Sequence, residues 1–148
     1  MENISDKFFF ASSLNKNNLF QKIKIEEIQE SGTLVGSLEF NNLKYTFIET
    51  SKNDISLFVM GIGVKANIKN IKRSKLNEEI LNLNKKYTNI KIKLDKTDSS
   101  FGFFRVEFSV ISTIDIRNPM AIIQPSCEVL FVVFLELKEI LEKNNKMD

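Results

Sequence analysis

The side chains that most often perform catalysis in small enzymes are nearly absent from this sequence. The 148-residue chain contains no histidine and a single cysteine, Cys127. Without an imidazole there is no Ser-His-Asp triad, no Cys-His pair and no ordinary histidine zinc site. The remaining carboxylates, lysines, tyrosines and lone thiol show no spacing that demands a reaction. We therefore expect a protein that is not an enzyme and that uses neither a metal nor a cofactor.

Two features could still be interpreted chemically. Glu26, Glu27 and Glu30 form an acidic group, but adjacent glutamates point apart on a helix, so a solvated surface is the favoured interpretation. Cys127 lies on an apolar stripe, which predicts a buried and inert thiol. One thiol cannot form an internal disulfide, and this agrees with a reducing, cytoplasmic environment.

Aromatic side chains give the best candidates for a binding surface. Residues 101–111 alternate as a strand, and Phe101 and Phe103 share a face with Arg105 and Glu107. The charged pair marks that face as exposed, which predicts a contact patch for a partner or a second subunit, since aromatics anchor interfaces. The alternative is that the Phe-rich residues 8–10 cover the two rings.

The predicted strand at residues 55–64 is apolar on both faces, with Phe58 and Met60 on one of them. A sheet with one solvated face should not contain such a strand. Either Phe58 and Met60 meet another chain, or the strand is central and covered by the N-terminal segment. Both interpretations remain open.

The charge distribution leaves room for other partners. Residues 65–96 carry ten basic and three acidic side chains, a local charge of +7, whereas the whole chain has +2. An acidic protein or nucleic acid could bind there, although nine of the ten are lysines and a solvated face is favoured. Phe101-Gly102-Phe103 also partly matches the base-stacking strand of RNA-recognition domains, which makes RNA the less favoured partner.

The remaining periodicities predict one α+β domain spanning residues 1–148. We expect a helix over residues 19–31 ended by Gly32, and a helix from residue 75 capped by Ser74. A last helix should follow Pro119, and the missing backbone donor of Pro125 predicts a kink or restart near Ser126. Strands are predicted at residues 33–40, 44–50, 55–64, 89–95 and 101–111.

This order is helix, three strands, helix, two strands, helix. It predicts an antiparallel sheet of about five strands with the helices mainly on one face. Residues 1–18 are expected to be a loop or a loosely packed end.

Nothing in the sequence indicates export or membrane insertion. Glu2 and Asp6 precede a short phenylalanine run, unlike a signal peptide. The longest uninterrupted apolar run, residues 129–135, is too short to span a bilayer. We expect a soluble cytoplasmic protein, and the abundance of lysine, isoleucine and asparagine is typical of an AT-rich bacterial genome.

The middle of the chain resembles a known family. LNEEILNLNKKY at residues 76–87 is followed by IKIKLD at residues 90–95 and FRVEF at residues 104–108. This pattern, like the element order over residues 19–143, is similar to that of the YbjN-like family, whose fold is shared with type III secretion chaperones. The resemblance implies a homodimeric or partner-binding α+β module without enzymatic chemistry.

These observations favour a non-enzymatic, chaperone-like or regulatory protein-binding module. Its partners would be another protein and a second copy of itself, with no membrane. The alternatives are an immunity or antitoxin-type protein that neutralises a toxin through the basic 65–96 region, and an RNA-binding sheet. The residues expected to contact the partner are Phe101, Phe103, Arg105, Phe58 and Met60.

Overall fold

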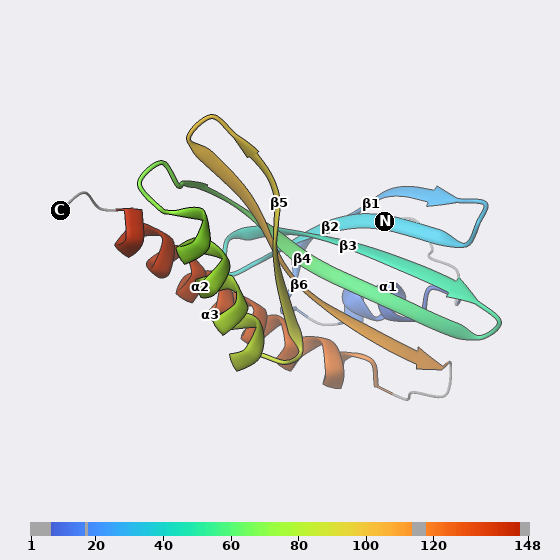
Figure 1. Ribbon diagram of the computed structural model, residues 1–148. Helices are drawn as coiled ribbons and strands as arrows, with labels where there is room; N and C mark the ends of the chain where they lie inside the picture. Colours follow the sequence, from blue (N-terminus) through green and yellow to red (C-terminus); the bar gives the residue numbers. More distant parts are fainter. Residues whose placement is uncertain (1–6, 17, 114–117, 146–148) are drawn as a thin grey trace. The chain divides into compact units, whose positions relative to one another are not determined.

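The computed structural model describes residues 7–16, 18–113 and 118–145. It shows an α+β fold with one antiparallel sheet of six strands in the order β1-β2-β3-β4-β6-β5 (Figure 1). Along the chain the elements are α1 (Phe9–Ser13), the 3-10 turn η1 (Leu14–Lys16), β1 (Gln21–Gln29), β2 (Thr33–Phe40), β3 (Leu43–Lys52), β4 (Ile55–Asn67), α2 (Arg73–Lys86), β5 (Ile90–Asp98), β6 (Phe101–Thr113) and α3 (Met120–Asn145). The predicted α+β class is confirmed, but there are six strands, and four of them precede α2.

The additional strand is β1, where the sequence predicted a helix over residues 19–31. Ile23 and Ile25 alternate as half-buried side chains, as a strand requires, and the glutamates that follow are exposed. Gly32 does not end a helix but forms the turn into β2 at φ +85°. A Cβ there would lie 2.7 Å from the carbonyl oxygen of Ser51. The helix prediction is wrong because the glycine stop and the acidic residues fit a hairpin equally well.

The three-strand meander that follows β1 is confirmed as β2, β3 and β4. β2 and β3 pair without a break from Thr33 opposite Thr50 to Phe40 opposite Leu43. Asn41 and Asn42 connect them with φ values of 51° and 62°. Asparagine tolerates this left-handed region, so the predicted tight turn forms as expected.

Residues 7–16 are folded, where the sequence suggested a loose end. Phe8, Phe10 and Leu14 are at most 1% exposed and belong to the core. The Phe10 ring lies 5.4 Å from that of Phe58, which in turn stacks on Phe47 at 5.7 Å. The other residues of the suggested loose end, 1–6 and 17, lie outside the described part of the chain.

The chain divides into two compact units. The first contains Met1–Met60 and Ser109–Pro125, and the second contains Gly61–Phe108 and Ser126–Asp148. In the second unit α2 and α3 lie side by side (Figure 1). α2 begins at Arg73 after Lys72, so Ser74 is its second residue and not its cap.

The last helix is more continuous than expected. α3 runs through Pro125 without a restart. By length and composition alone, α3 could cross a membrane, and 39% of its most apolar stretch is buried. The short uninterrupted apolar run at residues 129–135 therefore did not reveal that the whole helix is long and apolar enough to span a membrane. One side of α3 packs inward while another remains exposed.

Candidate functional site

The aromatic strand predicted from the sequence forms part of an exposed sheet surface in the second unit. Even-numbered residues of β6 from Gly102 to Phe108 are buried, whereas Phe103 and Arg105 are half-buried and Phe101 is 38% exposed. β5 pairs alongside with Lys96 opposite Phe103. We call the group Lys65, Lys96, Phe101, Phe103 and Arg105 the aromatic–basic surface. Of the two interpretations left open for these rings, exposure and not cover by residues 8–10 holds for Phe101.

Two lysines cover the rings of this surface. The Lys65 ammonium lies 4.7 Å from the centre of the Phe101 ring and 5.6 Å from that of Phe103. Lys96 lies 4.9 Å from the Phe103 ring on the β5 side. A cation over an aromatic face is attracted by the ring quadrupole, by about 0.5–1 kcal/mol at exposed sites. The surface therefore presents positive charge directly above apolar area.

Arg105 is held by a carboxylate on its own strand. Its Nε donates to Glu107 Oε2 at 2.9 Å, and Lys93 Nζ lies 3.4 Å from the other oxygen of Glu107. Gly61 on β4 makes room for the guanidinium, because a Cβ there would lie 3.0 Å from Arg105 Cζ. Arg105 is thus positioned across the sheet and already has an anionic partner.

Phe58 and Met60 are not available for docking. Both side chains are 0% exposed. Phe58 lies under the Phe10 ring of α1, so the alternative interpretation, a strand covered by the N-terminal segment, holds for this residue. The assignment of Phe58 and Met60 to a partner surface is corrected, because apolar character on both faces reflects burial within the chain.

Sequence reasoning missed a buried carboxylate in the first unit. Glu49 on β3 is 0% exposed and accepts hydrogen bonds from the backbone N–H groups of Phe10 (3.1 Å) and Ala11 (2.7 Å). The Ser56 hydroxyl donates to its Oε2 at 2.6 Å. Burial raises the pKa of Glu49, and the hydrogen bond from Ser56 and then the backbone donors oppose that shift. A signal was present, because residue 49 alternates in phase with the buried Tyr45 and Phe47.

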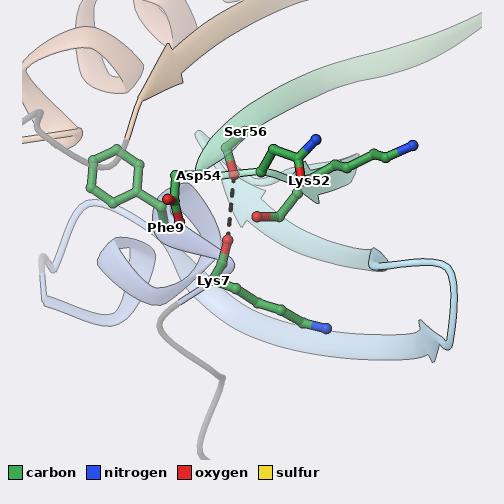
Figure 2. Close-up of a pocket in the computed structure, with 7 residues that line it drawn as sticks. Lys7, Phe9, Lys52, Asp54 and Ser56 are labelled. Carbon is green, nitrogen blue, oxygen red and sulfur yellow. Dashed lines mark hydrogen bonds between the residues drawn. The ribbon is translucent and has the colours of Figure 1, made fainter.

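A depression of about 280 Å³ opens beside this carboxylate. It is lined by Lys7, Phe9, Ser51, Lys52, Asn53, Asp54 and Ser56. Ser56 Oγ lies 3.5 Å from the carbonyl oxygen of Lys7 (Figure 2). The same view shows the side chains of Lys7 and Lys52 extending away from Ser56. The neighbouring Glu49 carboxylate is already bound by the N–H groups of Phe10 and Ala11 and by the Ser56 hydroxyl.

The other predicted chemical candidates occupy ordinary positions. Cys127 is 1% exposed, and burial raises the pKa of its thiol to about 12. Glu26, Glu27 and Glu30 are exposed on or beside β1. Among the residues that the structure describes, no three His, Cys, Asp or Glu side chains gather closely enough to hold a metal ion.

Comparison with known proteins supports the fold and gives no family by sequence. No family model matches the chain, and no curated protein matches it. An uncharacterised protein from Methanothermobacter thermautotrophicus superposes with a TM-score of 0.63 at 10% identity, covering 96% of this chain and 100% of the other. YbjN from E. coli, described as a candidate transcription regulator, gives a TM-score of 0.50 at 16% identity over 79% and 82% of the two chains. The fold of this protein is therefore YbjN-like.

Proposed function

We propose that this protein is a non-enzymatic binding module that captures another protein through the aromatic–basic surface. The observation that carries the proposal is the Phe101 ring, exposed on a sheet face beneath the Lys65 ammonium. Exposed aromatics flanked by cations supply both apolar area and charge to an interface. The role would be chaperone-like or regulatory, in a bacterial cytoplasm.

The charge of the surface specifies the partner's chemistry. Around the two rings, exposed or half-buried positions of β4, β5 and β6 carry five cations and three carboxylates: Lys65, Lys91, Lys93, Lys96 and Arg105 with Asp95, Asp98 and Glu107. Cationic excess favours a partner segment rich in Asp or Glu that also carries an apolar side chain to contact Phe101. A toxin neutralised by this chain would be one such partner.

Paired substitutions on β6 test the proposal. Phe101→Ser with Phe103→Ser should abolish capture of the protein that wild type retains from the source organism's lysate, identified by mass spectrometry. Ile111→Ser is the matched control, because Ile111 is a 72% exposed apolar residue on the same strand. Equal capture by all three proteins would exclude this surface.

Circular dichroism must show that the double variant remains folded. If the double variant is unfolded, Lys65→Glu tests the same surface without removing the rings, and undiminished capture by a folded Lys65→Glu protein would also contradict the proposal. Tight retention of single-stranded RNA with a steep salt dependence would replace the protein partner by nucleic acid.

A further inference from the structure

The exposed side of α3 carries apolar residues that no described part of the chain covers. Val129 is 40%, Val132 51% and Leu135 48% exposed. Their spacing of three places them on one face of the helix, opposite the buried stripe that contains Leu130 and Leu137. Isolated exposed apolar residues are common, but three consecutive members of one helical row form a patch that could face another helix.

The C-terminal half of the same face is hollowed. A shallow groove of about 460 Å³ is lined by Val132, Leu135, Glu136, Glu139, Ile140 and Lys143. The exposed apolar row Val129, Val132 and Leu135 forms a ridge, and its members Val132 and Leu135 also line the groove. Helices pack by placing the ridge of one into the groove of the other, so the ridge of one α3 could occupy the groove of another.

The charges at the two ends of this face fit an antiparallel copy. Glu128 lies seven residues before Leu135, and Lys143 lies seven residues after Glu136. If a two-fold axis passes between Leu135 and Glu136, Glu128 of each copy lies beside Lys143 of the other. The two ends are about 22 Å apart at 1.5 Å per residue. The same axis brings Val132 next to Ile140 and Glu139 of the second copy.

The carboxylate nearest that axis has a partner within its own chain. Glu136 accepts a hydrogen bond from the Tyr87 hydroxyl, and its other oxygen lies 2.8 Å from Lys86 Nζ. These contacts lower the pKa of Glu136, so it stays ionised and remains bound to α2. Two Glu136 side chains near the axis would each have a neutralising lysine, which reduces their repulsion.

We propose that two copies of this protein associate through antiparallel packing of α3 on α3, with Leu135 nearest the two-fold axis, Val132 and then Val129 farther from it, and Glu128–Lys143 ion pairs at both ends. This surface shares no residue with the aromatic–basic surface, so self-association can be tested independently of partner capture.

A charge exchange tests the proposal in the full-length protein. Wild type should dimerise reversibly by sedimentation equilibrium. Glu128→Lys or Lys143→Glu alone places like charges together at both ends and should weaken the dimer by about tenfold or more. The double variant Glu128→Lys with Lys143→Glu should recover most of the affinity. Recovery requires the antiparallel arrangement, because only then do the two positions meet.

Controls separate this outcome from loss of folding and from other occupants. Glu78→Lys changes the charge of an exposed residue on α2, which contributes nothing to the proposed α3 interface, and should leave the dimer unchanged. Phe101→Ser with Phe103→Ser should also leave it unchanged. A wild-type protein that is monomeric at about 100 µM would overturn the proposal. A double variant that dimerises no more tightly than the single variants would also overturn it. The same holds if wild type binds neutral phosphatidylcholine vesicles and Val132→Glu abolishes that binding.

Discussion

At the scale of single residues, the buried carboxylate Glu49 connects three segments of the first unit by hydrogen bonds. A carboxylate in phase with a buried strand face must find donors inside the core, because an uncompensated buried charge is costly. Glu49 finds them in the N–H groups of Phe10 and Ala11 and in the hydroxyl of Ser56. It thereby attaches the short α1 to β3 and β4 within the first unit.

The raised pKa of Glu49 predicts a pH-dependent stability. Because the folded state favours the neutral carboxyl, its contribution to the free energy of unfolding is greatest below the unfolded pKa, and it declines as the pH rises through the folded value. Glu49→Gln removes this titration and loses an acceptor, at a cost of about 1–3 kcal/mol. In urea unfolding, the free energy of unfolding of wild type should exceed that of Glu49→Gln by more at pH 4 than at pH 7. Glu27→Gln, which alters an exposed residue, is the control. A stability difference between wild type and Glu49→Gln that grows as the pH rises would contradict the raised pKa of Glu49.

Cys127 predicts a second outcome at this scale. Burial raises the pKa of its thiol to about 12, so almost no thiolate is present at pH 8. A thiol-specific reagent such as Ellman's should label the native protein only at the rate of opening of the structure, and should label it fully in urea. Rapid stoichiometric labelling of native protein would show that the thiol is accessible.

At the scale of elements, the contact of α2 with β5 decides how the sheet ends. β5 is an edge strand, and such strands present unpaired backbone groups. The Asn84 side chain of α2 accepts from the Ile92 N–H at 2.7 Å and donates to the Ile92 carbonyl at 3.0 Å. The amide of Asn84 thus occupies the pairing positions that an added strand would use, and β5 is closed at this point.

Removing that amide should open the edge. Asn84→Ala leaves both backbone groups of Ile92 without these bonds, so we expect a loss of about 1–3 kcal/mol in the free energy of unfolding. Amide hydrogen exchange at Ile92 should accelerate. Asn84→Asp keeps the acceptor oxygen and should lose less stability. Asn82→Ala alters an exposed residue of the same helix and should change neither the free energy of unfolding nor the exchange rate at Ile92. Unchanged exchange at Ile92 in Asn84→Ala would show that another group protects the strand.

At the scale of the whole molecule, charge is distributed unevenly. Residues 65–96 carry a net +7, while the remaining 116 residues must carry −5 to give the total of +2. Long-range attraction of an acidic partner depends on this asymmetry and is screened over about 10 Å at 0.1 M salt. Capture of the partner should therefore weaken when sodium chloride is raised from 50 to 500 mM. Salt-independent capture would indicate that the contact is mainly apolar.

The sequence predicted correctly those features that depend on residues close together along the chain. Alternation assigned β2, β3, β5 and β6, because one face of each is buried and the period of two is clear. The positive φ values of Asn41 and Asn42 followed from their residue type. The exposure of Phe101 followed from charged neighbours on the same face. Each of these inferences uses residues only a few positions apart.

The errors arose where burial depends on distant segments. Residues 19–31 match a helix and a strand about equally, and pairing with β2 selects the strand. Phe58 and Met60 were assigned to a surface because the sequence cannot show that Phe10 covers Phe58. Glu49 was overlooked because its donors lie 38 and 39 residues away.

The sequence by itself determined the α+β class, the tight asparagine turn, the buried position of Cys127 and the aromatic strand, since these depend on local periodicity and side-chain type. Only the tertiary structure decided that residues 21–29 are a strand, that α1 covers Phe58, and that Asn84 closes the edge of β5. The physical reason is that hydrogen bonding and burial between distant segments determine which of several locally acceptable conformations is adopted.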